Sequence, residues 1–523
     1  MTGHTACGDL KNSGHSMSWR PPRATRTMSR SPWQAPCPRR TATSGFFARL
    51  SQRNPLKVSI SRYETFHLAA THAYNETVPG THFYPRSIER RLGEALEDSP
   101  VVLIHGPRQC GKTTLAQFTC APRHLTWRRS YVTWRGNRLS WRYSQEHRDY
   151  QYVSFDDLAA KDGARDDPMG FVAALPERVI LDEVQRVPEL FGAIKLAVDR
   201  RRVPGRFLMT GSSNVLLVPQ LSESLAGRLQ IVRLHPLAQV ELEGQSLTPN
   251  QPSGFLGALF GDGFRVSQSE RLGLRLIEKV VAGGFPPALA APTERRRANW
   301  YRNYIETLIQ QDVRDMSRIR SLDVLPRLLS AAASQTAQLF NLSDLASHFE
   351  LTRPAIDTYV TLLERLFLLE RLPAWHSNRV KRIVKRPKLH LVDAGICAAL
   401  LGADTSTLAA NRPLLGQLLE TFVYQEVRRQ ASWCDQPAEF FHFRNKDGAE
   451  VDIVIEQPAG AVAGVAVKAS GTVRHGDFTG LRKLQTAVGD RFARGVVLYN
   501  GETCTPFGDR LYAVPIRWLW ESP

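Results

Sequence analysis

The sequence has few cysteines and no long apolar run, and both absences exclude classes of protein. Its seven cysteines are scattered and none stands in a CxxC pair, so the pattern indicates neither a disulfide framework nor a zinc site. No apolar stretch approaches the ~18 residues that a membrane helix requires. The amino-terminal region also lacks the apolar core of a secretory signal. We therefore expect a cytoplasmic protein with no membrane partner.

Acidic residues are in deficit as well, with 50 Asp and Glu against 68 Lys and Arg and a formal net charge of +18. Such a balance favours nucleic-acid binding only if the charge lies on the folded core. Residues 1–82 hold eleven basic against three acidic residues, and residues 121–150 hold seven against two. Most of the excess lies in these two segments, which supports nucleic-acid binding by the core only weakly.

Both basic segments look peripheral to the fold. Residues 1–82 are rich in Ser, Thr, Pro and Arg without periodicity, which predicts a disordered extension. An organellar transit peptide and a mis-assigned translation start are the alternatives. In residues 121–150, Trp127-Arg128, Trp134-Arg135 and Trp141-Arg142 recur every seven residues, as in a surface insertion or a stacking platform for single-stranded bases.

Strand-like and helical runs alternate after this insertion, which is typical of a parallel sheet flanked by helices. From about Glu270 to Trp375 the apolar spacing becomes helical, and from Lys388 onward strands and helices mix again. A chain of 523 residues has room for three or four domains. The pattern predicts an α/β front, a helical middle and an α/β tail.

The stretch "GPRQCGKT" matches the phosphate-loop pattern GxxxxGK[ST] between an apolar strand, residues 101–104, and a helix from residue 113. Its glycines let backbone N–H groups surround the β- and γ-phosphates at the start of the helix. Lys112 adds a positive charge there, and the Thr113 hydroxyl is expected to hold Mg²⁺. The predicted nucleotide-binding residues are Gly106, Pro107, Arg108, Gln109, Cys110, Gly111, Lys112, Thr113 and Thr114.

Two acids follow the buried strand-like run at residues 179–181. Asp182 is expected to organise Mg²⁺, and Glu183 to orient and deprotonate the attacking water. A third strand, "RFLMTGSSN", ends in Thr210 and Ser212, which can reach the γ-phosphate or its water. Arg228 is a candidate transition-state finger in the same or a neighbouring subunit; a surface ion pair is the alternative.

These residues resemble a family, the bacterial and archaeal ATP-binding proteins of the AAA superfamily with an uncharacterised C-terminal domain. The likeness spans roughly residues 84–485, through "GPRQCGKTTL", "ILDEVQRVPELF", "LMTGSSN", "LAGRL", "GGFPPAL" and "EVDIVIE". It implies a P-loop NTPase sheet, a helical lid, a winged-helix segment and an α/β restriction-endonuclease-like domain. The expected boundaries are 83–237 for the ATPase domain, 238–320 for the lid, 321–376 for the winged helix and 377–523 for the C-terminal domain.

The helix-turn-helix spacing of residues 341–375 leaves two roles open for the winged helix, DNA binding or packing and protein contact. The basic run 379–388 follows it. Its side chains either contact a phosphate backbone or belong to a solvated basic strand. The residues concerned are Arg379, Lys381, Arg382, Lys385, Arg386 and Lys388.

The tail places Glu420 on a helix, Asp452 on a strand and Lys468 on the next strand. This arrangement resembles the restriction-endonuclease-like core, in which acids and a lysine bind a divalent metal and activate water. Ala466 stands two residues before Lys468, where that core has an acid. Since Mg²⁺ sites rely on carboxylates, we expect nuclease activity to be lost. The remaining charges are then expected to form a structural ion network or a nucleic-acid contact surface.

The sequence therefore predicts a Mg²⁺-dependent ATPase that acts as a conformational switch or motor on a protein or nucleic-acid partner, with a homo-oligomer as one arrangement. The alternatives are an ATP-regulated, metal-dependent nuclease and a DNA-binding switch that does not hydrolyse ATP.

Overall fold

The computed structural model describes residues 83–120, 133–135, 138–140, 150–212, 221, 224–243, 254–316 and 323–521. All of them belong to one compact unit, residues 62–523. The predicted extension at 1–82 lies outside the described residues. Of the insertion at 121–150, only residue 150 and the backbone of two strands are described, and these strands, β2 (Thr133–Arg135) and β3 (Arg138–Ser140), pair antiparallel.

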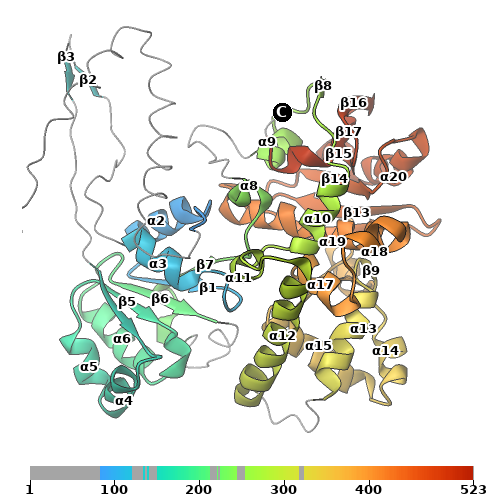
Figure 1. Ribbon diagram of the computed structural model, residues 1–523. Helices are drawn as coiled ribbons and strands as arrows, with labels where there is room; N and C mark the ends of the chain where they lie inside the picture. The colour runs from blue at the N-terminus through green and yellow to red at the C-terminus, as the bar shows by residue number, and fades with distance from the viewer. Residues whose placement is uncertain are drawn as a thin grey trace, which may run out of the picture. The chain divides into compact units, whose positions relative to one another are not determined.

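The amino-terminal part contains a parallel sheet of five strands in the order β4-β5-β6-β1-β7 (Figure 1). Every residue of β1, β5 and β6 is buried, which fits apolar runs covered on both faces. The strands are β1 (Val101–His105), β4 (Gln151–Ser154), β5 (Val179–Asp182), β6 (Phe207–Gly211) and β7 (Leu229–Arg233).

Helices cover both faces of this sheet. α2 and α3 pack on the face that carries Val102 and Ile104, and α4, α5 and α6 pack on the other (Figure 1). Local signals set their starts, since Asp157 and Asp167 cap α4 and α5 through their side chains. The helices are α2 (Glu89–Asp98), α3 (Lys112–Cys120), α4 (Leu158–Asp166), α5 (Pro168–Ala174) and α6 (Leu190–Arg200).

The middle of the chain is helical, as its apolar spacing predicts. It begins with the one-turn helix α8 (Gln239–Leu242) and continues through α9 (Gly254–Phe260), α10 (Leu274–Ala282), α11 (Pro286–Leu289) and α12 (Glu294–Met316). Three further helices follow, which are α13 (Val324–Ser334), α14 (Leu342–His348) and α15 (Arg353–Arg365). The side chains of Asn341 and Thr352 cap α14 and α15.

A small antiparallel sheet accompanies these last three helices, with the strand order β10-β11-β9. Its strands are β9 (Gln338–Leu339), β10 (Leu369–Leu372) and β11 (Lys388–Leu391), and α16 (Arg379–Val384) lies between the last two. Because β11 pairs with both other strands, the predicted boundary between residues 376 and 377 cuts through this sheet.

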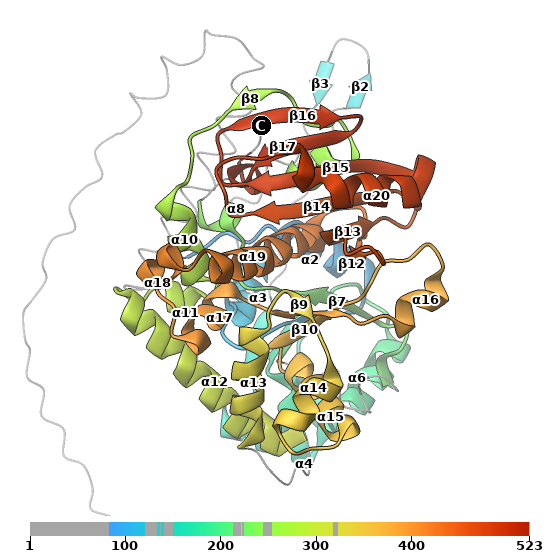
Figure 2. The same ribbon diagram turned by 90° about the vertical axis from the view of Figure 1, so that its right-hand side faces the viewer.

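The C-terminal part is a sheet of seven strands in the order β12-β13-β14-β15-β17-β16-β8. α19 covers one face and α20 the other (Figure 2). The strands are β8 (Ser267–Gln268), β12 (Glu439–Arg444), β13 (Glu450–Glu456), β14 (Val462–Lys468), β15 (Phe492–Tyr499), β16 (Thr503–Gly508) and β17 (Leu511–Pro515). The helices α17 (Ala394–Leu401), α18 (Thr405–Ala410), α19 (Arg412–Trp433) and α20 (Thr479–Val488) complete this part.

The chain thus has a mixed α/β fold with a parallel sheet in front and a separate sheet at the C-terminus, as predicted. No helix among the described residues combines the length and apolarity that a membrane crossing needs.

Candidate nucleotide site

The phosphate-loop motif joins the end of β1 to the start of α3. Gln109 and Gly111 adopt left-handed conformations with φ of 59° and 96°, which explains the glycine at the second position. At Gly106 a Cβ atom would lie 2.1 Å from the carbonyl oxygen of Leu234, so only glycine fits beside the segment that follows β7. Both glycines of the motif are therefore required by the backbone itself.

Lys112 folds back onto the loop that precedes it. Its Nζ donates to the carbonyl oxygens of Gly106 at 3.2 Å and Pro107 at 2.8 Å, and the residue is buried. Cys110 is also buried, and this burial raises the pKa of its thiol. The loop thus holds a fixed positive charge and a thiol that stays protonated.

Asp182 ends β5 and accepts hydrogen bonds from three hydroxyl groups. Thr113 Oγ1 lies 2.9 and 3.1 Å from its two carboxylate oxygens, Tyr152 Oη lies 2.8 Å away, and Thr210 is the third donor. Burial, followed by the bond to Asp182, raises the pKa of Tyr152 to about 12. The two predicted metal-binding residues, Thr113 and Asp182, therefore lie in direct contact.

Glu183 follows in a left-handed conformation, with φ of 56°, a strained geometry for a residue other than glycine. Its backbone N–H donates to Thr210 Oγ1 at 3.1 Å, and its carboxylate accepts a bond from Gln185 Nε2. Gln185 Nε2 also donates to Ser212 Oγ at 3.0 Å. The carboxylate of Glu183 is thus held from within its own turn, by a glutamine that sequence analysis did not single out.

Thr210 lies between the two acids. It is fully buried, and its hydroxyl is bonded to Asp182 and to the Glu183 amide. These bonds orient the two acids, and the contact of Thr210 with a γ-phosphate or its water stays a prediction.

Arg228 is not brought to this site. It precedes β7, and its carbonyl accepts a bond from Val101 at the start of β1, whereas the phosphate loop follows the end of β1. The length of the strand separates the two by on the order of 15 Å. Its guanidinium instead pairs with Asp199 at 2.6 and 3.0 Å. This placement contradicts the predicted role as a finger in the same subunit.

The nuclease-like residues of the C-terminal sheet assemble around a different lysine from the one predicted. Lys388 Nζ lies 2.7 Å from Glu420, 2.5 Å from Glu450 and 3.3 Å from Asp452, and its side chain is 2% exposed. Burial opposes the charge of Lys388, but the three carboxylates raise its pKa above the usual value. Burial and the neighbouring Asp452 raise the pKa of Glu420 well above its usual value.

Lys468, by contrast, is 44% exposed and pairs with Asp477 at 3.6 Å. Ala466 is buried in the apolar core beneath α20. Within the described ranges no group of three or more His, Cys, Asp or Glu residues could hold a metal ion. Glu420 and Asp452, together with Glu450, bind an internal ammonium group.

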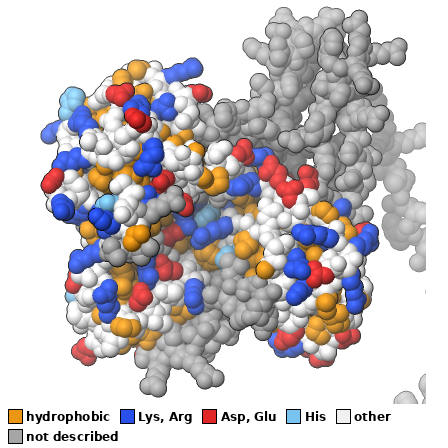
Figure 3. Space-filling view, turned by 180° about the vertical axis from the view of Figure 1, so that it is seen from behind, with side chains coloured by type: hydrophobic (Ala, Val, Ile, Leu, Met, Phe, Trp, Pro, Cys, Tyr) orange, Lys and Arg blue, Asp and Glu red, His pale blue; other side chains and the backbone are white. Residues whose placement is uncertain are grey.

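The basic run 379–388 is divided between solvent and core. Lys381, Lys385 and Arg386 are exposed. Arg382 is buried and pairs with Glu456 at 2.7 Å, and Lys388 lies in the acid cluster. These two residues are therefore wrong as predicted phosphate contacts; the side chain of Arg379 lies outside the described residues. On the face shown in Figure 3, described Lys and Arg side chains are interspersed with acidic and hydrophobic ones and form no continuous patch.

Comparison with known proteins agrees with the site in the parallel sheet. Residues 98–243 match the family model described as AAA domain, and residues 274–407 and 415–519 match two domains of unknown function (DUF8612 and DUF4143). The predicted resemblance is confirmed, and the chain carries a P-loop domain of the AAA type followed by two domains of unknown function. The match supports a P-loop ATPase.

Relatives add no further function. Two proteins described as uncharacterized, from Mycobacterium bovis and Mycobacterium tuberculosis, are each 29% identical over 434 residues, which cover 82% of this chain and 83% of theirs. The Walker-type ATPase PABY2304 of Pyrococcus abyssi is similar at 15% identity over 61% of this chain and 96% of that chain. Its TM-score of 0.36 carries no argument about the fold.

Proposed function

We propose that the AAA domain binds ATP with Mg²⁺ and hydrolyses it. The observation that carries this proposal is the contact between Thr113 and Asp182 beside a loop that holds Lys112. Mg²⁺ prefers oxygen ligands and keeps several waters, so one hydroxyl and one carboxylate are a sufficient protein contribution. The donor set therefore fits the ion, which supplies a positive charge beside the phosphates.

Each residue of the site then has a role of its own. The loop amides and Lys112 bind phosphate oxygens, with Lys112 leaving the carbonyl groups of Gly106 and Pro107. Asp182 is fixed by its hydroxyl partners, and Glu183 orients a water and accepts its proton. Before the water binds, Gln185 holds the Glu183 carboxylate. Arg228, which lies away from this site, would act on a neighbouring subunit.

We also propose that residues 323–391 form a winged helix and that ATP turnover changes the conformation of this region for a partner. The order of elements supports this, since α13, β9, α14, α15, β10 and β11 follow the helix–strand–helix–helix–strand–strand order of that module, with α16 inserted between the last two strands. A protein partner is favoured over DNA because Arg382 and Lys388 are engaged internally. The ammonium of Lys388 among the acids supports a structural role for the nuclease-like region.

Two substitutions in the intact chain test the ATPase proposal. Lys112→Ala should abolish ATP binding, and Glu183→Gln should retain binding while turnover falls by a factor on the order of 10² or more, because only the water-orienting group is lost. Phosphate release and calorimetric ATP titration measure the two effects separately. Equal turnover by the wild type and both variants would contradict the proposal.

A further inference from the structure

The carbonyl group of Cys110, in the phosphate loop, is bonded by an arginine far upstream in the chain. Arg86 Nη1 donates to the Cys110 carbonyl at 2.8 Å, Nη2 to the His235 carbonyl at 2.6 Å and Nε to Glu241 Oε1 at 3.1 Å. The Arg86 side chain is 8% exposed. One guanidinium therefore ties the loop to the segment between β7 and α8.

The bond to the Cys110 carbonyl fixes the peptide group between Cys110 and Gly111. In a trans peptide the C=O and N–H point in opposite directions. Holding the Cys110 carbonyl on one side therefore directs the Gly111 N–H to the other, where a phosphate loop binds its ligand. Since Gln109 and Gly111 both have positive φ, this peptide lies between two unusual conformations that a fixed partner can stabilise.

Glu241, the partner of Arg86, is itself part of the short helix α8. Its Oε1 accepts a bond from Ser87 N–H at 2.8 Å, and its Oε2 accepts one from Ala238 N–H at 3.0 Å. The position of α8 and that of the Arg86 guanidinium are thus linked through one buried carboxylate.

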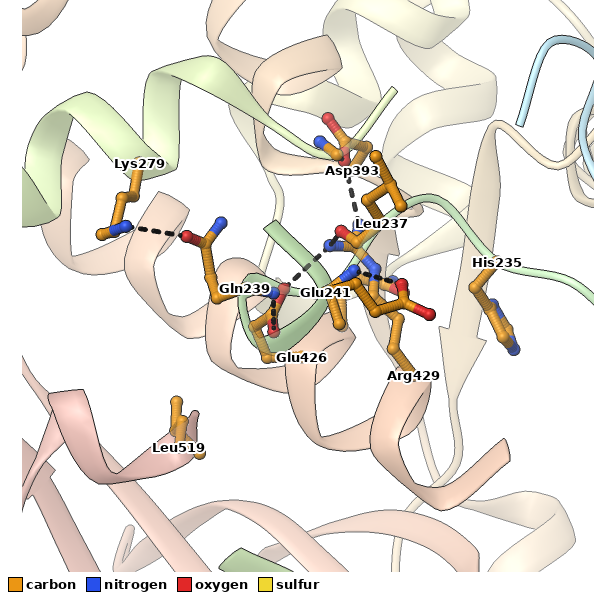
Figure 4. Close-up of polar contacts among 12 residues, drawn as sticks. His235, Leu237, Gln239, Glu241, Lys279, Asp393, Glu426, Arg429 and Leu519 are labelled. Carbon is orange, nitrogen blue, oxygen red and sulfur yellow. Dashed lines mark hydrogen bonds and ion pairs between the residues drawn. The ribbon is translucent and has the colours of Figure 1, made fainter. Parts of the chain in front are cut away.

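The C-terminal part holds the other side of α8 (Figure 4). Glu426 Oε2, on α19, accepts a bond from the Gln239 N–H at 2.9 Å, which supplies the cap that the Ala238 side chain cannot give. Arg429 Nη1, one turn further along α19, donates to the Leu237 carbonyl at 2.8 Å and to Glu426 at 2.9 Å. Its Nη2 donates to Asp393 at 2.9 Å.

Arg429 forms buried ion pairs with Glu426 and Asp393, and the contacts with Gln239 and Leu237 are hydrogen bonds to backbone groups. Glu426 and Asp393 have fully buried side chains, and that of Arg429 is 3% exposed. Removing one member of such a group leaves its partner charged and unpaired, so the group favours one arrangement of the elements it joins. The series runs without a break from α19 through α8 to the phosphate loop.

We propose that Arg86 is the positioning residue of the phosphate loop and that Glu426 and Arg429 set its position through α8, so that the C-terminal part controls nucleotide affinity. This inference rests on the proposed ATP binding by that loop. By reciprocity, ATP bound at the loop must favour the same arrangement of α19.

The test compares two buried arginines, Arg429 on α19 and Arg382 on α16, in the full chain. Arg429→Met breaks the series, whereas Arg382→Met removes a buried arginine from an ion pair with Glu456 that does not touch α8. Arg429→Met should weaken ATP binding about tenfold or more, a usual size for coupled sites, while Arg382→Met stays within about twofold. Calorimetric Kd values for ATP with Mg²⁺ are measured below the melting temperature of each variant.

A double-mutant cycle separates positioning from general damage. Arg86→Met should also weaken ATP binding. Adding Arg429→Met to the Arg86→Met protein should reduce the affinity for ATP much less than Arg429→Met does in the wild type, because the series of contacts is already broken. If Arg429→Met does not fold, Glu426→Gln keeps the shape of the side chain and serves in its place. Wild-type affinity in the folded Arg429→Met or Glu426→Gln protein overturns the inference, as does full additivity. Absence of ATP binding in the wild type defeats the proposed function instead.

Discussion

Replacing the buried Lys388 by methionine removes the ammonium from three partly buried carboxylates and keeps most of the side-chain volume. Removing one partner of a buried ion pair costs about 3–5 kcal/mol of unfolding free energy, because the remaining charges are left uncompensated. The contacts of 2.7 Å to Glu420 and 2.5 Å to Glu450, at a side chain 2% exposed, place Lys388 in this class. Lys468→Met is the matched control, since this lysine is 44% exposed and its pair with Asp477 spans 3.6 Å. An exposed pair contributes about 0–1 kcal/mol.

The loss should depend on pH in one direction. In the wild type the raised pKa of Lys388 keeps the ammonium charged, so its stabilisation is present at every pH below its unfolded pKa of about 10.4. Burial and Asp452 raise the pKa of Glu420 in the folded state, and Lys388 opposes this shift. In Lys388→Met that opposition is lost, so protonation of Glu420 favours folding and the defect shrinks as the pH falls towards about 5. Thermal unfolding at pH 8 and pH 5 measures this. Equal losses in the two variants, or a loss in Lys388→Met that pH does not change, would refute the reasoning.

Three further predictions concern other charged groups. Burial raises the pKa of Glu426 to about 7. The protonated form therefore stabilises the fold below the unfolded pKa of about 4.3, and this stabilisation is lost as the pH rises through 7. Thermal unfolding should show that the wild type loses roughly 3 kcal/mol of stability between pH 4 and pH 8 relative to Glu426→Gln. Asp182→Asn should make the Kd for ATP insensitive to Mg²⁺ concentration, and an unchanged Mg²⁺ dependence in calorimetry would speak against its role. If Arg228 acts on a neighbouring subunit, Arg228→Ala and Lys112→Ala proteins, each inactive alone, should regain phosphate release when mixed; no recovery on mixing would exclude that role.

Local patterns predicted the conformation of the phosphate-loop motif between β1 and α3, because its requirements are local. Gly106 is required by a close approach of the backbone and Gly111 by a positive φ. Lys112 and Thr113 follow directly in the sequence. The confirmed AAA-type domain and the parallel sheet rest on such short-range signals.

The contacts that the sequence did not predict depend on which strands become neighbours in the sheet. Arg228 directly precedes β7, and only the direction of β7 in the sheet puts it at the edge away from the loop. Tyr152 reaches Asp182 because β4 pairs with β5.

The lysine of the acid cluster was misassigned for the same reason. Lys468 is predicted because its strand resembles the lysine-bearing strand of the restriction-endonuclease-like core. Lys388 is separated from Glu420 by 32 residues and from Asp452 by 64, and no local pattern joins them. The series from Arg86 to Arg429 is equally long-range, so it could be recognised only in the folded chain.

The most direct test of the account is a calorimetric titration of the intact, folded protein with ATP and Mg²⁺. A saturable heat in the wild type that disappears in Lys112→Ala is the predicted result. No heat from the folded wild type at millimolar ATP would contradict the claim that this loop binds a nucleoside triphosphate.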